Sequence, residues 1–332
     1  MATIKSDFLT LMDWATRKDP NGRIPAIVEM MNKTNDILED MPFVEGNLPT
    51  GHETTMRTGL PKVAWRQINK GVQPSKSTTV KHTDVCGRLE AFSEIDEALV
   101  ELAADVSAFR LSEDRPFIEA MNQEMAETVF YGDLRKTPDK FLGIAPRFAL
   151  KSAESGENIL NGGMSGDAGT RRSSVYLVGW GNDTVHGIFP KGTQAGLQHE
   201  DLGRKEAHDA EGGRYMAYKG HYTWRMGLCV RDWRYIVRIA NIDLDTLAGD
   251  TPANLMKLMI EASEIIPKLG LCKPAFYCTR EVRTALRNQI LEKNNVNLTW
   301  DTVAGKRVLA FDEIPVRRCD AISTSEAQIS FA

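Results

Sequence analysis

The sequence lacks the features that mark membrane, secreted and strongly basic proteins. No apolar run approaches the roughly 18–20 residues that a membrane-spanning helix needs. The first residues, MATIKSDFLTLMDW, contain no basic region followed by an apolar core, so we predict no secretory signal. The net charge of −4 gives no support to a protein that binds nucleic-acid phosphates over its whole surface. It does not exclude a local contact with nucleic acid.

Cysteine is scarce and forms no CxxC pair in this chain of 332 residues. The five cysteines are Cys86, Cys229, Cys272, Cys278 and Cys319. An odd count in a chain of this length favours reduced, mostly buried thiols, because disulfide frameworks are typical of small secreted domains.

The signatures of common catalytic sites are also missing. There is no GxSxG sequence, and the glycine-rich stretch NGGMSGDAG at 161–169 lacks the lysine of a phosphate-binding loop. His199 and His208, in HEDLGRKEAHD, are too far apart for a zinc protease, whose two histidines lie four residues apart on one helix. We therefore predict no catalytic residue, no metal site and no cofactor.

What the sequence does contain is a long polar segment at residues 45–83, punctuated by glycine and proline. Compact domains rarely carry a loop of more than about 12–15 residues without a function or disorder behind it. The composition predicts one strand at 61–70 and a returning strand at 77–85. Two strands alone are marginally stable in water, so Trp65 on such a ribbon is expected to have a partner surface.

Helical patterns flank this segment. Apolar residues recur at helical spacing over 3–19 and 24–41, and again from Phe92 onward. Pro116 is expected to kink or restart the last of these helices, which then ends at Tyr131-Gly132. The residues predicted to form its buried face are Ile118, Met121, Met125 and Val129.

The second half of the chain alternates strand and helix patterns, which indicates an α+β fold. We predict paired strands at 175–178 and 185–189, a polar loop at 190–213 and strands over 214–240. Helices are predicted after Thr251-Pro252 and Thr279, with strands at 275–278, 308–311 and 314–316. The arginines of the strands at 214–240 could line a solvated face, form intersubunit ion pairs or contact nucleic acid: Arg225, Arg231, Arg234 and Arg238.

An ordered set of segments carries a resemblance to a known family. The segments run GLPKVAWRQINKGVQPSKSTT, AFSEIDEAL, ETVFYGD, TPDKFLGIAPRF, SSVYLVGWG, IFPKGTQAGLQHEDLG and RDWRYIVRIANID. In this order, from about residue 40 to 318, the chain resembles the major capsid proteins of short-tailed and related tailed bacteriophages.

The resemblance implies the tailed-phage major capsid fold. Within it, residues 1–44 would form an N-terminal arm and 45–90 an extended β-ribbon loop. A peripheral domain would span 91–240, with a long spine helix at about 109–131 and a sheet. An axial domain would span 241–311, and residues 312–332 would return to the core.

The resemblance also implies a structural protein rather than an enzyme. It would assemble as pentamers and hexamers into an icosahedral head that encloses the phage double-stranded DNA. The expected location is the virion, after assembly in the host bacterial cytoplasm, with a separate scaffolding protein, a portal and no membrane. A cement protein on the shell and non-specific contact with the packaged DNA are further expected partners.

In the extended loop, we expect Trp65 to be an apolar anchor on an adjacent subunit. The expected charge contacts are Arg57, Arg66, Lys70 and Lys76. Two alternatives remain open at this point. One is a soluble enzyme whose long loops are active-site lids, and the other is a nucleic-acid-binding protein that uses the arginine-rich strands.

Overall fold

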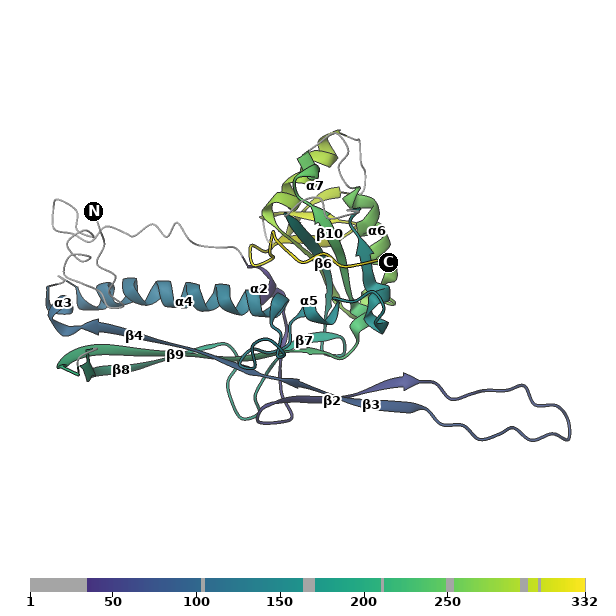
Figure 1. Ribbon diagram of the computed structural model, residues 1–332, viewed down its shortest axis with the longest axis horizontal. Helices are drawn as coiled ribbons and strands as arrows, with labels where there is room; N and C mark the ends of the chain where they lie inside the picture. Colours follow the sequence, from purple (N-terminus) through teal and green to yellow (C-terminus); the bar gives the residue numbers. More distant parts are fainter. Residues whose placement is uncertain are drawn as a thin grey trace. The chain divides into compact units, whose positions relative to one another are not determined.

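The computed structural model describes residues 35–102, 105–163, 171–209, 212–248, 254–292, 298–303 and 306–331 (Figure 1). These residues fall into two compact units, each built from several segments. The first unit comprises Arg88–Met125 and Gly196–Arg225. The second comprises the described parts of 35–87, 126–195 and 226–331. Among the described helices, none combines the length and the apolar character needed to cross a bilayer.

The first unit is a three-stranded sheet with a long helix. Its strands are β4 (Gly87–Asp96), β8 (Leu197–His208) and β9 (Arg214–Val230), with β9 between β8 and β4. The helices α3 (Glu97–Glu101) and α4 (Val106–Tyr131) follow β4. A small core of Ile95, Leu99, Val100 and Phe109, with Tyr218 packed against it, joins β4, both helices and β9.

Helix α4 begins and ends where local chemistry favours it. The Asp105 carboxylate accepts hydrogen bonds from the backbone N–H groups of Ser107 and Ala108, at 2.9 and 3.1 Å, as an N-cap residue does. At the other end, Gly132 N–H donates to the Thr128 carbonyl at 2.9 Å. The helix continues through Pro116. The predicted end at Tyr131-Gly132 is therefore confirmed, whereas the predicted break at Pro116 is not.

Three of the four residues predicted for the buried face of this helix are buried: Met121, Met125 and Val129. The prediction that Ile118 is buried is wrong, because its side chain is 40% exposed. Phe117 stacks on Tyr222, with ring centroids 6.4 Å apart. Successive helical residues point about 100° apart, so the side of α4 that turns Phe117 toward β9 turns Ile118 outward.

The second unit is built on a larger sheet. Strands β12 (Leu298–Val303), β13 (Lys306–Phe311), β14 (Ile314–Arg318), β11 (Lys273–Cys278), β6 (Arg172–Trp180), β7 (Val185–Phe189) and the end of β9 follow one another in that order. Strand β10 (Ile236–Asp243) pairs with β6 and with β5 (Ile159–Asn161), and β1 (Phe43–Glu45) pairs with β7. Strand β6 is buried over nearly its whole length, as expected of a central strand.

Short helices complete the second unit. They are α2 (Ile37–Asp40), α5 (Ile144–Arg147), α6 (Leu255–Ile265) and α7 (Arg280–Glu292), with 3₁₀ turns at Glu154–Asn158, Trp233–Tyr235, Thr246–Ala248 and Leu269–Leu271. Thr279 Oγ accepts from Val282 N–H at 3.4 Å and starts α7 as predicted. Helix α6 begins later than predicted, with Asn254 as its N-cap. The predicted cap, Thr251-Pro252, lies outside the described residues, as does the chain before residue 35.

Four predictions of local structure are wrong. Residues 92–96 belong to strand β4 rather than to a helix, and 197–208 form strand β8 rather than a loop. The ribbon strands are β2 (Gly51–Gly59) and β3 (Thr78–Val85), so the strand expected at 61–70 is absent while the returning strand is confirmed. Strands β6 and β7 share only one parallel pair, Trp180 with Val185, and do not form a hairpin.

The prediction for cysteine is confirmed. All five thiols are free; Cys229, Cys278 and Cys319 are buried, and Cys86 and Cys272 are half-buried. Burial raises the pKa of the Cys278 thiol to about 12, which leaves it protonated and unreactive at neutral pH.

Candidate intersubunit surfaces

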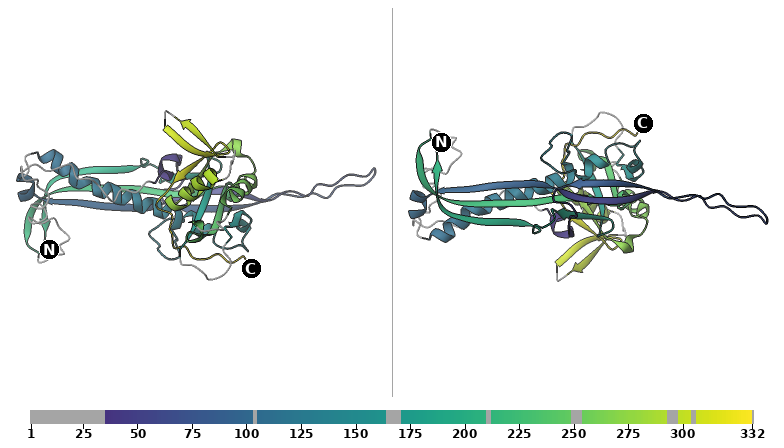
Figure 2. Two further views of the ribbon diagram at one scale, coloured as in Figure 1. Left: turned by 90° about the horizontal axis from the view of Figure 1, so that it is seen from above. Right: turned by 90° about the horizontal axis from the view of Figure 1, so that it is seen from below.

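The ribbon loop, residues 60–77, joins strands β2 and β3. The two strands pair antiparallel from Gly51 opposite Val85 to Gly59 opposite Thr78. Beyond this ladder the loop has no strand pairing, and the hydroxyls of Thr58 and Thr78, 3.3 Å apart, mark its base. In both views of Figure 2, no helix or strand of its own unit lies beside the loop.

The ribbon loop exposes large apolar side chains to solvent. Trp65 is fully exposed, and Leu60, Val63 and Ile68 are each more than 80% exposed. Val72 is a fifth, at 47%. Isolated exposed apolar residues are common, but five on one loop of 18 residues form a concentration that soluble monomers rarely present without a binding role. This loop therefore has the apolar content of a docking segment.

The charge of the ribbon is of one sign. Residues 54–83 contain no aspartate or glutamate. The cations on and beside the loop are Arg57, Lys62, Arg66, Lys70, Lys76 and Lys81. Lys81 pairs with Glu53 at 2.8 Å, and Arg66 Nε donates to the Lys70 carbonyl at 3.0 Å. Because the whole chain carries −4, this local excess of positive charge suits an acidic partner surface.

Sequence reasoning selected Trp65 and four of these cations as contacts, but it did not select Lys62 or the apolar residues Leu60, Val63, Ile68 and Val72. The structure places all of them on one segment. The sequence does contain a signal for this group of residues. Residues 54–83 form a run of 30 without an acidic side chain, which is conspicuous in a chain with 45 aspartates and glutamates.

A buried ion pair fixes the base of the ribbon. Asp84 on β3 is 3% exposed, and its Oδ1 accepts from Arg147 at 2.6 Å and lies 3.2 Å from His82 Nε2. Its Oδ2 accepts from Val230 N–H at 3.4 Å. Burial acts to raise the pKa of Asp84, but His82 and Arg147 outweigh burial and hold this pKa below its ordinary value. The carboxylate thus ties β3 to α5 and β9.

Replacing Asp84 with asparagine is expected to loosen the ribbon base. The change keeps the side-chain shape but leaves the largely buried Arg147 guanidinium without its counter-charge, which costs about 3 kcal/mol in such pairs. Hydrogen exchange at neutral pH should be faster in β2 and β3 of the D84N variant than in the unaltered chain. Unchanged protection of both strands would show that the pair does not hold the ribbon.

Helix α4 exposes two large apolar side chains and carries more acidic than basic residues along its length. Leu111 and Ile118, seven residues apart and hence two turns along one side, are 54% and 40% exposed. The helix carries five acidic residues, Glu113, Asp114, Glu119, Glu124 and Glu127, against Arg110 and Arg115. Arg110 is itself paired with Asp201 at 2.7 Å and lies over the Tyr218 ring. The helix as a whole thus combines exposed apolar area with a net negative charge, the reverse in sign of the ribbon loop.

The arginine-rich strands do not form a continuous cationic face. For Arg238 the interpretation as a solvated side chain is wrong, because Arg238 is 4% exposed and pairs with Glu326 at 2.8 Å. Arg231 pairs with Asp183 at 2.8 Å, and Arg234 pairs with Asp232 at 2.7 Å. Arg225 is half-buried. Three of the four arginines therefore form ion pairs within the chain, which removes the observation that favoured nucleic-acid binding.

The described surfaces thus suit association and show no constellation for turnover. A model of the family described as major capsid protein GP7 matches residues 19–330. The chain belongs to this family. A major capsid protein is a structural component of the virion rather than an enzyme, and it assembles into a multimeric shell of pentamers and hexamers. The alternative of an enzyme with lid loops therefore has no support.

One solved structure agrees with the family. The chain is similar to a protein in the near-atomic structure of bacteriophage epsilon15, with 33% identity and a TM-score of 0.78 over 98% of this chain and 99% of that one. The α+β tailed-phage capsid fold implied by the sequence is thereby confirmed. A chain from Mycobacterium phage Bobi is a weaker likeness, at 11% identity and a TM-score of 0.43 over 70% of this chain and 98% of that one. A search of curated protein sequences gives no match.

Proposed function

We propose that, in the capsid shell, the ribbon loop of each GP7-family subunit lies on a neighbouring copy. The observation that carries this proposal is the presence of five exposed apolar side chains and only positive charges on one segment. Trp65 serves as the apolar anchor, and Arg57, Arg66, Lys70 and Lys76 make the charge contacts. Since every subunit carries one loop, individually weak contacts add up around the closed shell.

The acceptor that best matches the loop is the outward side of α4 on the neighbouring copy. Leu111 and Ile118 offer apolar area to Trp65, and the acidic excess of the helix offers counter-charge to the loop. Complementary charge orients the two copies during encounter, and burial of the apolar side chains then holds them.

The proposal extends to the domains of the chain and to its partners. Residues 1–44 act as an N-terminal arm and 45–90 as the extended loop; 91–240 form the peripheral domain, 241–311 the axial domain, and 312–332 return to the core. Assembly in the host bacterial cytoplasm uses a separate scaffolding protein and a portal, and the icosahedral head encloses double-stranded DNA that it contacts without sequence preference. A cement protein is a further partner of the outer surface.

Trp65→Ala is the direct test of the anchor. Removing a buried tryptophan side chain costs about 3–5 kcal/mol, so the loss of the anchor should raise the subunit concentration needed for assembly at least tenfold. Sedimentation velocity and electron microscopy measure shells against free subunits. The matched control, Trp65→Phe, retains most of the apolar area and should assemble near the normal concentration.

Hydroxyl-radical footprinting tests the acceptor separately. Trp65, Leu111 and Ile118 should all react in free subunits and all be protected in shells. Protection of Trp65 without protection of Leu111 and Ile118 would place the acceptor elsewhere. Normal assembly of the W65A variant at the usual concentration would reject the anchor itself.

A further inference from the structure

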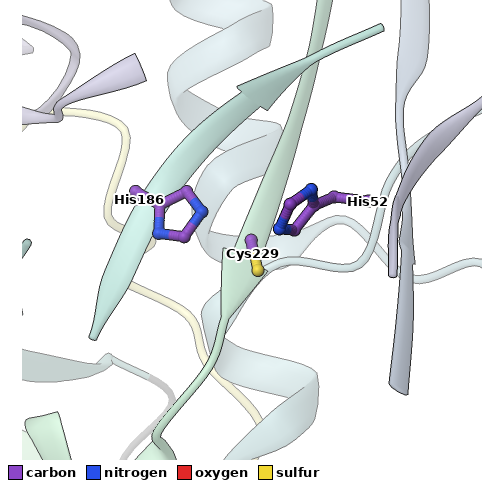
Figure 3. A group of neighbouring side chains, drawn as sticks. All are labelled: His52, His186 and Cys229. Carbon is purple, nitrogen blue, oxygen red and sulfur yellow. The ribbon is translucent and has the colours of Figure 1, made fainter. Parts of the chain in front are cut away.

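Three potential metal ligands that are far apart in the sequence converge in the second unit. His52 lies on β2 at the ribbon base, His186 on β7 and Cys229 on β9. One ligand atom of each side chain lies within 4.8 Å of the ligand atoms of the other two. Figure 3 shows the imidazole rings of His186 and His52 facing each other, with the Cys229 side chain beside the gap between them.

His186 is the most informative member of this cluster. It is 1% exposed, and neither of its ring nitrogens forms a hydrogen bond of ordinary geometry. A buried polar group without a partner is costly, and native structures retain very few. The imidazole therefore has a lone pair available, and among the described residues His52 and Cys229 are the ones whose ligand atoms group with it.

We propose that His52, His186 and Cys229 form a zinc site that pins the base of the ribbon to the sheet. Two imidazole nitrogens and one thiolate match the preference of Zn²⁺ for nitrogen and sulfur, and a water molecule completes four-fold coordination. Zinc bonds of about 2.0–2.3 Å separate tetrahedral ligand atoms by about 3.3–3.7 Å. The upper bound of 4.8 Å exceeds these separations by about 1 Å, so zinc binding would draw the three side chains together by up to that amount.

The charges around the site favour neutral imidazoles. Burial lowers the pKa of His186 to about 4, with His52 and Arg231 acting in the same direction, so at neutral pH the ring is neutral and one of its two nitrogens bears a lone pair. Burial, followed by Arg231, also lowers the pKa of His52. A weak contact with the backbone of Gly181 acts to raise the pKa of His186 and so opposes the effect of burial. The Gly181 carbonyl could accept the N–H of a His186 ring bound to zinc, an arrangement that is common behind zinc-binding histidines.

Zinc binding carries two local costs. Burial raises the pKa of the Cys229 thiol to about 12, so coordination must release its proton to solvent, and Asp84 nearby acts in the same direction as burial. His52 Nδ1 accepts a 3.2 Å hydrogen bond from Asn47 N–H. Coordination through Nε2 places the ring proton on Nδ1, and this long bond is then given up. Three metal–ligand bonds outweigh the loss of one exposed hydrogen bond.

The experiment uses the full-length chain, first treated with a chelator and then titrated with ZnCl₂ against a competing chromophoric chelator. We expect one zinc per chain, and a loss of affinity of at least 100-fold in His52→Gln and in Cys229→Ser. The matched controls are His208→Gln on β8 and Cys272→Ser, which leave the cluster intact and should bind as the unaltered chain does.

A second measurement avoids any dependence on the folding of variants. Co²⁺ bound to the unaltered chain should show the intense visible absorption of four-fold coordination together with a thiolate-to-cobalt charge-transfer band. Zinc should also slow hydrogen exchange in β2 of the unaltered chain but not of H52Q. Weak binding of several metal ions, cobalt without a thiolate band, or equal affinity in H52Q and H208Q would each overturn the proposal.

Discussion

Replacing residues 60–77 with a two-residue Asn-Gly turn is expected to leave the subunit folded and to abolish shell assembly. The turn connects Gly59 to Thr78, which already face each other at the end of the β2–β3 ladder. Asn-Gly favours the tight turn that such antiparallel strands require. The only side-chain hydrogen bonds recorded within the loop, from Arg66 to the Lys70 carbonyl and from Ser75 to the Lys62 carbonyl, are internal to it.

The deletion should leave the stability of the folded subunit unchanged, because the loop buries almost no surface in the isolated chain. All of its residues except Ser77 at its end are exposed, and the base is held independently by Asp84 and Arg147. Shortening a loop also lowers its closure entropy slightly, so the melting temperature of the variant should equal or slightly exceed that of the unaltered subunit.

The shell, in contrast, should lose the apolar contact that we propose for the loop. Electron microscopy and sedimentation, under conditions in which the unaltered chain assembles, should detect free subunits or small oligomers only. A scrambled loop of the same length and composition is the matched control for loop size. Normal shells from the deletion would refute the proposed role, whereas an unfolded subunit would show that the loop belongs to the core.

The elements that could be predicted from sequence are those with strong periodicity and clear ends. Helix α4 has apolar residues at helical spacing, Gly132 beyond its last turn and an acidic cap at Asp105. Strands β6 and β10 are rich in β-branched and aromatic residues because both of their faces are buried. In these segments, local preference and tertiary packing favour the same structure, so the pattern alone was sufficient.

The wrong predictions for β8 and for the end of β4 have one physical cause: long, thin sheets bury few side chains, so their strands lack a clear apolar pattern. Strand β8 buries only Ala207 and is otherwise half-buried or exposed, because its stability comes from backbone pairing with β9. Its sequence therefore resembles a polar loop. At the end of β4, Ile95 is four residues before Leu99, a helical spacing, yet the two residues belong to a strand and a helix that share one core.

The side-chain sites were the least predictable part. Trp65 could be selected because a tryptophan among polar turn residues is conspicuous. The His52, His186 and Cys229 cluster could not, since its members lie on three strands whose pairing no local pattern reveals. Arg238 was misjudged because its partner, Glu326, lies 88 positions later in the C-terminal segment.

Glu326→Gln is expected to destabilise the subunit more than any other conservative substitution considered for this protein. The Glu326 carboxylate is buried and accepts hydrogen bonds from Arg238 at 2.8 Å, Tyr131 at 2.5 Å and Tyr176 at 3.1 Å, and from Ser174. Burial, with the nearby carboxylate contributing, raises the pKa of the Tyr131 hydroxyl, which therefore remains a proton donor.

E326Q is expected to lose stability because the Arg238 guanidinium stays buried without its counter-charge. Arg238 also donates to Ser174 Oγ at 3.1 Å and to the Phe148 carbonyl at 2.9 Å, so its guanidinium cannot turn to solvent when Glu326 becomes neutral. Breaking one side of a buried ion pair costs about 3–5 kcal/mol, a large part of the stability of an ordinary domain. Urea unfolding of unassembled subunits should show this loss as a lower midpoint with an unchanged slope.

Two further variants separate charge from packing. Glu281→Gln removes the carboxylate of an exposed pair with Arg171 and should leave the unfolding midpoint unchanged. The double variant Arg238→Met with Glu326→Gln removes the unpaired cation and should recover part of the loss, which a double-mutant cycle measures as coupling between the two positions. If E326Q and E281Q unfold at the same urea concentration, the buried pair does not anchor the C-terminal segment. A midpoint shift confined to E326Q, with recovery in the double variant, would establish that residues near 326 are held to the sheet by charge as well as by apolar burial.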